Sequence, residues 1–287
     1  MSDVRTQDTS APQDQPSNRP GGFIWYELMT TDAASAKKFY DAVIGWNIDD
    51  HNTVPGGGDV DYRMINRSDG GFAGGVLVLT NDMIAHGAKP TWIGYLHVDN
   101  VDQTLAAIEA DGGKTLMPAH DMEGVGRMAM VADPWGAPFY IMTPTPPADQ
   151  PDATSDVFSV DQPQHVRWND LASSDQDGAI AFYTKHFGWT QQGAMPMGEM
   201  GDYKFIQFDG VGIGAIMRKL PRHPGVGWTF YIGVDDIDRA VAAVKDGGGT
   251  LASEPMQIPG GEYSVHATDP QGVVVGLVGP RKSGDAQ

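Results

Sequence analysis

The feature that most constrains the fold is an internal repeat. Residues 25–46 read WYELMTTDAASAKKFYDAVIGW, and residues 168–189 read WNDLASSDQDGAIAFYTKHFGW. Trp, an acid two positions later, Leu, Asp, Phe-Tyr and Gly-Trp recur at the same spacings. Two later stretches also match, namely WIGYLHVDNVD (92–102) with WTFYIGVDDID (228–238), and ADPWG (132–136) with TDPQG (268–272). Self-similarity over this length indicates two copies of one folding unit.

The repeat also suggests where the domains begin and end. A segment rich in Pro, Asp and Ser, residues 146–163, separates the copies and is typical of a linker. We expect a first domain over 21–145 and a second over 164–281. Residues 1–20 are polar without an apolar core, which predicts a disordered tail rather than a secretory signal. Residues 282–287 form a short C-terminal tail.

Each copy alternates strand-like and helix-like patterns. A strand pattern precedes Asp32, which is placed to cap a helix over 33–44 that ends near Gly45. Further helices are expected over 100–110, 176–186 and 236–245, each followed by strand patterns. Each domain is therefore predicted to contain two consecutive units, each a strand followed by a helix and further strands. This order indicates an α+β fold.

Composition limits the classes of partner. The formal net charge is −18 in a chain of 287 residues, so phosphate backbones and anionic lipid surfaces would repel this protein. We therefore expect neither nucleic acid nor a membrane as a partner, which leaves a small-molecule ligand open. Cysteine is absent, which excludes disulfides, thiolate nucleophiles and Cys-ligated metals. No apolar run approaches the ~20 residues needed to span a bilayer, and a cytoplasmic location is expected.

Three motifs in the same order in both copies carry a family resemblance. D-x₆-FY-x₄-GW, the helix start V-D-[ND]-[VI]-D and the closing D-P-x-G together resemble the vicinal oxygen chelate superfamily, which includes glyoxalases, bleomycin-resistance proteins and extradiol dioxygenases. The resemblance implies two tandem domains, each a pair of βαβββ modules that form a curved eight-stranded mixed sheet around a cleft. Such a pair would mimic the dimer of single-domain relatives, so we expect a monomer with a pseudo-dimeric domain pair, or a homodimer.

The resemblance also implies where a divalent metal would bind in catalytic relatives. The corresponding positions here are Trp25, Ile93 and Tyr140 in the first copy and Trp168, Thr229 and Gly276 in the second. The remaining position falls within GGVLVLT or GVGIGAIMR, which contain neither His nor a carboxylate. Indole, aliphatic and glycine positions offer nothing to a divalent ion. We therefore expect no metal and no cofactor.

A displaced polar site is predicted instead. Because strand side chains alternate, Glu27 shares the face of Trp25, and His97 shares the face of Tyr95, so both could enter the first cleft as an acid–base pair. Aromatic walls are expected from Trp25, Tyr95 and Tyr140, with Trp168, Asp170 and Tyr231 as counterparts in the second cleft. Gly233 is the equivalent of His97 in the second copy, so either only the first domain is active or His97 is an ordinary strand histidine. His266 is expected to be solvated.

Three functions remain open from the sequence. The first is a metal-free protein that binds a small aromatic, cationic or carbonyl metabolite in its clefts. The second is a glyoxalase-like lyase or another enzyme acting on a small carbonyl substrate, with Glu27 as the base and His97 or Tyr95 as the acid. The third is a non-catalytic scaffold whose clefts are filled by side chains.

Overall fold

The computed structural model describes residues 19–52, 60–146, 148–220 and 225–282. The first half contains β1 (Phe23–Thr30), α1 (Ala33–Ile44), β2 (Asn47–Ile48), β3 (Tyr62–Asn66), β4 (Phe72–Val78), α2 (Asn81–Ala85), β5 (Thr91–His97), α3 (Val101–Ala110), β6 (Lys114–Met122), β7 (Gly126–Ala132) and β8 (Pro138–Pro144). The second half contains β9 (Val166–Ser173), α4 (Gln176–Phe187), β10 (Thr190–Pro196), a short 3₁₀ turn (Gly198–Met200), β11 (Asp202–Phe208), β12 (Val211–Arg218), β13 (Gly227–Gly233), α5 (Ile237–Asp246), β14 (Thr250–Leu251), β15 (Met256–Gln257), β16 (Tyr263–Thr268) and β17 (Val274–Gly279).

Each half builds its own mixed sheet. The first sheet has the order β2-β3-β4-β1-β5-β8-β7-β6, and the second has the order β10-β11-β12-β9-β13-β17-β16-β14, with β15 paired to β16. In both sheets the first strand of each module pairs in parallel with the last, and the two modules meet antiparallel, at β1–β5 and at β9–β13. The prediction of two tandem α+β domains made of paired modules is confirmed.

Local signals place the helices where the sequence predicted them. The Asp32 side chain accepts a hydrogen bond from the Ser35 amide, and Gly45 ends α1 in the left-handed region at φ 87°. Asp175 and Gly188 play the same parts at the two ends of α4. These caps satisfy backbone groups that have no partner within the helix, so the boundaries are set within a few residues of sequence.

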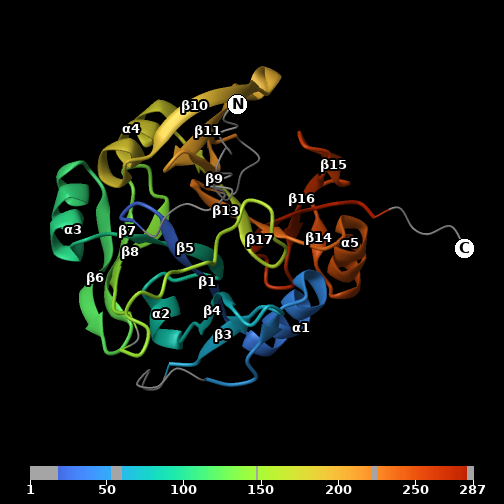
Figure 1. Cartoon of the computed structure of the whole chain (residues 1–287), viewed down its shortest axis with the longest axis horizontal. Coiled ribbons are helices and arrows are strands. Elements are labelled where there is room, and N and C mark those ends of the chain that lie inside the picture. Colours follow the sequence, from blue (N-terminus) through green and yellow to red (C-terminus); the bar gives the residue numbers. More distant parts are fainter. Residues whose placement is uncertain (1–18, 53–59, 147, 221–224, 283–287) are drawn as a thin grey trace, which may run out of the picture.

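The repeated Phe-Tyr and Gly-Trp residues hold the two halves together. The reciprocal hydrogen bonds are Tyr40 to Asp269, Tyr183 to Asp133, the Trp46 indole to the Gln164 carbonyl, and the Trp189 indole to the Gly21 carbonyl. In each half, the tyrosine of the helix donates to the Asp of the Asp-Pro turn in the other half. The tryptophan after the helix donates to a backbone carbonyl just before the first strand of the other half. Figure 1 shows the result: α1 lies beside α5, and α4 beside α3. The repeat therefore encodes a pseudo-twofold domain interface.

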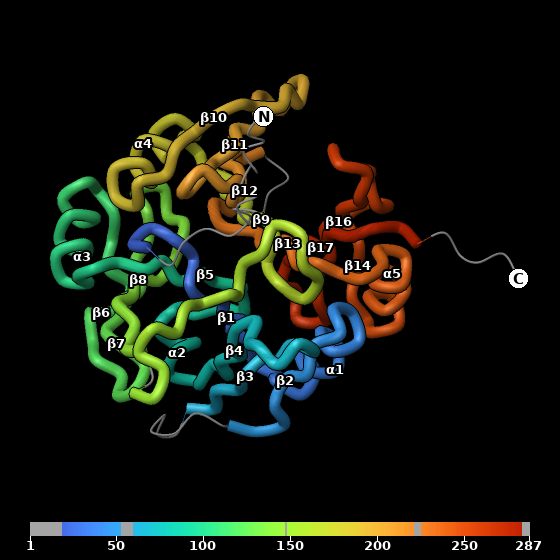
Figure 2. Tube along the Cα trace, viewed as in Figure 1, coloured from blue at the N-terminus to red at the C-terminus, as the bar shows by residue number. Residues whose placement is uncertain are grey.

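The segment that joins the halves is packed rather than loose. Val157 and Phe158 are buried in the common core, and the Ser155 hydroxyl donates to the Ile24 carbonyl. Arg67, buried at the β3–β4 turn, forms an ion pair with Asp156. Figure 2 shows this yellow-green segment passing between the two domains. Its composition predicted a linker, but its apolar residues contribute to the core.

Two elements of the first half were not predicted from the sequence. Residues 117–122 belong to the edge strand β6, because they pair antiparallel with β7. The short helix α2, capped by the Thr80 hydroxyl, was not expected.

Most of the predicted N-terminal tail, residues 1–18, lies outside the described residues, as does most of the C-terminal tail. Within the described ranges, no helix is both long and apolar enough to cross a membrane.

Candidate functional site: paired carboxyl–aromatic clusters

The first candidate site is built on β1 of the first domain. Glu27, only 2% exposed, faces the same side of the sheet as Trp25. The Tyr95 hydroxyl on β5 donates to Glu27 Oε2 at 2.8 Å, and the Trp25 indole donates to the Tyr62 hydroxyl at 2.8 Å. Tyr140 on β8 stacks on Tyr95, with ring centroids 4.2 Å apart. We call these five residues the domain-1 cluster.

The second half repeats this arrangement on β9. Asp170, 6% exposed, accepts a hydrogen bond from the Tyr203 hydroxyl, which in turn accepts one from the Trp168 indole at 2.6 Å. Tyr231 on β13 pairs with Trp168, two positions before Asp170, and its hydroxyl helps to lower the pKa of Asp170 and lies 2.5 Å from His266 Nε2. These five residues form the domain-2 cluster. In each half one tyrosine hydroxyl donates to a buried carboxyl, Tyr95 to Glu27 and Tyr203 to Asp170, and a second tyrosine lies nearby.

Burial changes the acidity of both carboxyls. Loss of solvent raises the pKa of Glu27 from 4.5 to about 7, although the hydroxyls of Tyr95 and Tyr62 partly offset this rise. Burial likewise raises the pKa of Asp170 from 3.8 to about 7, against the lowering effect of its phenol and indole neighbours. A carboxyl with a pKa near 7 can take or give a proton at neutral pH.

Glu27 keeps one oxygen without a hydrogen bond. Within the described part of the chain, Oε1 is buried and accepts no hydrogen bond, while Oε2 accepts from Tyr95. A buried acceptor left in this way costs free energy, of the order of 1–3 kcal/mol, unless a proton or a ligand satisfies it. The surrounding side chains are apolar or aromatic. A bound molecule that donated a hydrogen bond to Oε1, or protonation of the carboxyl, would reduce this cost.

The two clusters differ in how exposed they are. Tyr95 and Tyr140 are buried with Ile93, Met128 and Met142, so apolar side chains pack closely around the domain-1 cluster. The tryptophan and the β3 or β11 tyrosine are half-buried in both clusters, so the difference lies in Tyr231 and His266, which are half-buried in the domain-2 cluster. The second cluster is therefore the more accessible of the two.

The structure does not bring Glu27 and His97 together. Glu27 pairs with Ile93 across β1 and β5, four residues before His97 at the end of β5. Four strand residues correspond to about 13 Å, which is beyond hydrogen-bonding reach. The expected direct pair is therefore absent, because face alternation says nothing about position along the strand. Tyr95 is the group that contacts Glu27.

Three residues of the two clusters were not predicted as site residues from the sequence. Tyr62 and Tyr203 each follow an Asp at the start of a strand pattern, in DYRMI and DYKFI. The recurrence of this Asp-Tyr dipeptide in both copies could have identified them. His266 was expected to be solvated, but it is half-buried and contacts Tyr231. Its position opposite Gly276 on β17 depends on strand register, which the sequence does not specify.

The residues at the family's metal positions do not fit a divalent metal. The Trp25 and Tyr140 side chains of the first half lie in the aromatic cluster, and Gly276 has no side chain. Across residues 19–52, 60–146, 148–220 and 225–282, no group of three His, Cys, Asp or Glu side chains is placed to hold a metal ion. The donor set is aromatic and phenolic, which suits organic molecules better than hard or borderline cations.

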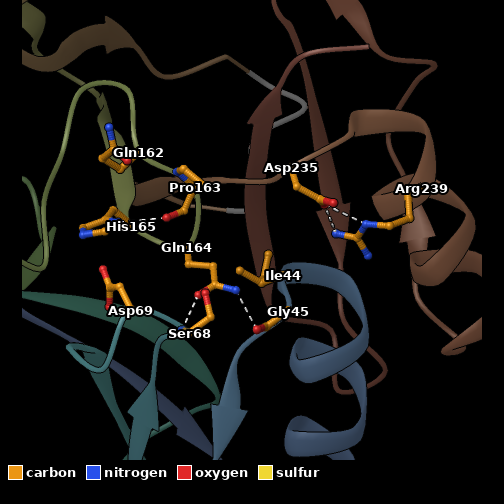
Figure 3. Close-up of a pocket in the computed structure, with 10 residues that line it drawn as sticks. All are labelled: Ile44, Gly45, Ser68, Asp69, Gln162, Pro163, Gln164, His165, Asp235 and Arg239. Atoms are coloured by element: carbon orange, nitrogen blue, oxygen red, sulfur yellow. Dashed lines mark hydrogen bonds and ion pairs between the residues drawn. The ribbon is translucent and has the colours of Figure 1, made fainter. Parts of the chain in front are cut away.

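A separate cavity of about 330 Å³ lies at the seam between the domains (Figure 3). Most of the polar groups that line this cavity form hydrogen bonds or ion pairs within the protein. The Gln164 side chain donates to the Gly45 carbonyl and accepts from the Ser68 amide, and its backbone has a positive φ of 66°. Asp235 is paired with Arg239. This network joins the two halves and is best explained as part of the interface.

Comparison with known proteins places this geometry in a family. The Glyoxalase/Bleomycin resistance protein/Dioxygenase superfamily matches residues 22–141 and 162–277, one match in each half. The Mycobacterium tuberculosis protein "Putative glyoxylase CFP32" is 33% identical over 265 residues, which cover 91% of this chain and 96% of that protein. "Anthracycline biosynthesis protein DnrV" from Streptomyces peucetius is 25% identical over 275 residues, covering 90% and 93%.

Solved structures share the fold at low identity. The Mn(II)-bound glyoxalase from Novosphingobium aromaticivorans superposes with a TM-score of 0.60 at 16% identity, covering 91% of this chain and 82% of that one. The 2,2',3-trihydroxybiphenyl 1,2-dioxygenase from Sphingomonas wittichii gives 0.62 at 14% identity, covering 93% of each chain. With matches in both halves and the predicted module order observed, this chain belongs to the Glyoxalase/Bleomycin resistance protein/Dioxygenase superfamily.

Proposed function

We propose that the protein binds a small, planar aromatic carbonyl compound in its domain clefts without using a metal. The observation that carries this proposal is the repeated cluster, in which aromatic side chains surround one buried carboxyl where relatives would hold a metal ion. Aromatic walls supply stacking surface, and the carboxyl supplies a directed hydrogen bond. The name of the 25%-identical relative from Streptomyces peucetius, an anthracycline biosynthesis protein, supports a polycyclic aromatic ligand.

The electrostatics favour a neutral ligand over a cation. A pKa of about 7 means that Glu27 and Asp170 are only partly ionised at neutral pH, so neither offers a full negative charge. When protonated, either carboxyl can donate to a ligand carbonyl oxygen, and when ionised it can accept from a ligand hydroxyl. Hydroxylated aromatic ketones present both groups.

Binding can be tested with an anthraquinone probe that carries hydroxyl groups. We expect it to quench tryptophan fluorescence in the presence of EDTA, and we expect added Mn²⁺ or Zn²⁺ to leave the Kd unchanged. Asp170→Asn should weaken binding about tenfold or more, because a charge-capable hydrogen-bonding group is worth at least ~1.4 kcal/mol. Exposed Asp202→Asn, at the start of β11 in the same sheet, is the matched control. A Kd that needs metal, or that both substitutions leave unchanged, would contradict the proposal.

The near-neutral carboxyls favour a second candidate function, an enzyme acting on a small carbonyl substrate. Glu27 or Asp170 would move the proton, with a tyrosine as the neighbouring donor. A positioned general acid or base typically contributes 10²–10⁴-fold. We therefore expect Glu27→Gln and Asp170→Asn together to lower any observed turnover at least ~100-fold while leaving probe affinity within tenfold of the single variants. Turnover that survives both substitutions would exclude Glu27 and Asp170 as the groups that move the proton.

A further inference from the structure

The two clusters differ at one position on the last strand of each sheet. In the first half Tyr140 pairs with Tyr95 between β8 and β5 and stacks on its ring. In the second half Gly276 pairs with Tyr231 between β17 and β13. A Cβ at Gly276 would lie 2.4 Å from the Tyr231 ring. The missing side chain therefore lets the Tyr231 ring lie over the backbone of β17.

This position brings Tyr231 to a histidine. His266 on β16 is the residue opposite Gly276, and its Nε2 lies 2.5 Å from the Tyr231 hydroxyl. In the first half the residue opposite Tyr140 is Met130, whose thioether carries no exchangeable proton. In the domain-2 cluster one phenol therefore contacts an imidazole and lies beside a buried carboxyl, whereas the domain-1 cluster has a thioether in the place of that imidazole.

We propose that Asp170, Tyr231 and His266 form a proton relay that makes domain 2 the proton-exchanging half of the protein. The relay deepens the proposed function, since it takes Asp170 as the carboxyl that faces the ligand. Asp170 is buried, whereas Tyr231 and His266 are half-buried, so the relay leads from the buried carboxyl toward the surface.

Because the Tyr231 hydroxyl has a single proton, the protonation state of Asp170 determines the tautomer of His266. Burial and the Asp170 carboxylate raise the pKa of Tyr231, so its hydroxyl stays protonated and has one proton to donate. When Asp170 is ionised, Tyr231 donates to it, and His266 must carry its proton on Nε2 to donate to the phenol oxygen. When Asp170 is protonated, Tyr231 donates to His266 instead, and the imidazole proton resides on Nδ1.

Proton delivery follows from these two states. His266 takes up a proton at Nδ1 and passes its Nε2 proton to the Tyr231 oxygen, while the Tyr231 proton moves to Asp170. Tyr231 ends as a phenol, His266 ends neutral, and Asp170 ends as a carboxylic acid, so one proton has been transferred in total. Asp170 can then donate this proton to a ligand oxygen. The reverse sequence removes a proton from a ligand.

The test reads the tautomer of His266 in the full-length protein without any ligand. Long-range ¹H–¹⁵N correlation spectra distinguish a protonated Nδ1 from a protonated Nε2, and a His266→Gln spectrum assigns the signals. At pH 8.5 we expect the Nε2–H tautomer in the wild type. We expect Asp170→Asn, whose amide can donate to the phenol as the protonated acid does, to shift His266 to the Nδ1–H tautomer.

Two further variants give the controls. Glu27→Gln, the equivalent change in domain 1, should leave the His266 tautomer as in the wild type. In a Tyr231→Phe background, Asp170→Asn should cause no tautomer change, because the connecting hydroxyl is gone. The same tautomer in wild type and Asp170→Asn would overturn the relay, as would a change that persists without the Tyr231 hydroxyl. Since no ligand is present, failure of ligand binding would leave this result intact and would count only against the proposed function.

Discussion

Replacing Glu27 by Gln tests whether ionisation of this buried carboxyl destabilises the folded protein. A carboxyl whose pKa is raised in the folded state binds more protons folded than unfolded between the two pKa values. The free energy of unfolding should therefore fall as pH rises from 4.5 to about 7, and the full penalty should be present above pH 7. At about 1.36 kcal/mol per pKa unit, a rise from 4.5 to about 7 corresponds to about 3 kcal/mol.

Gln cannot ionise but keeps a side-chain oxygen that can accept from Tyr95. The stability of Glu27→Gln relative to wild type should therefore improve by about 2 kcal/mol between pH 5.5 and pH 8.5, which is the part of the penalty that develops over that interval. Urea unfolding at several pH values measures this difference. The contribution of Asp170 cancels, because both proteins contain it.

Glu123→Gln provides a matched control, since Glu123 is exposed in the turn between β6 and β7. It removes the same formal charge and should change stability by less than about 0.5 kcal/mol at every pH. The reasoning is refuted if the stability difference for Glu27→Gln is constant across this pH range. It also fails if Glu123→Gln shows the same pH trend.

Two further substitutions test the interface and the asymmetry between the clefts. Tyr183→Phe removes the donor to buried Asp133 in the other half and should lower the free energy of unfolding by about 1–3 kcal/mol in urea titrations; an unchanged midpoint would show that this bond is dispensable. Gly276→Ala places a methyl group where the Tyr231 ring lies and should cost about 1–3 kcal/mol. A crystal structure of this variant should show Tyr231 moved away from His266, and an unmoved ring would contradict the packing argument.

The difference between the two clusters has a simple physical origin. Both halves contain the carboxyl and two tyrosines, but in the first half the Tyr140 ring stacks on Tyr95 opposite Met130, whereas in the second half Gly276 leaves room for the Tyr231 ring beside the polar His266. Apolar packing around the first cluster adds buried apolar area and stabilises the chain. The second half can then retain half-buried polar groups that cost stability.

The sequence by itself determined the features that depend on short-range chemistry. The spacing of Asp32, Phe39-Tyr40 and Gly45 predicts a capped helix and its buried face, because caps and periodicity act within a few residues. The repeat predicts two equivalent domains, and the loss of ligating side chains is likewise visible in the sequence. These predictions needed no knowledge of which strands are neighbours.

Only the tertiary structure decided which polar groups meet. Glu27 and Tyr95 are 68 positions apart, and Tyr231 and His266 are 35 apart, so their contacts depend on sheet order and register. Alternation assigned Glu27 and His97 to one face, but register placed Ile93 opposite Glu27 and left His97 about 13 Å along the strand. Register is set by the packing of whole strands and by turn geometry, and a single strand's sequence does not carry that information.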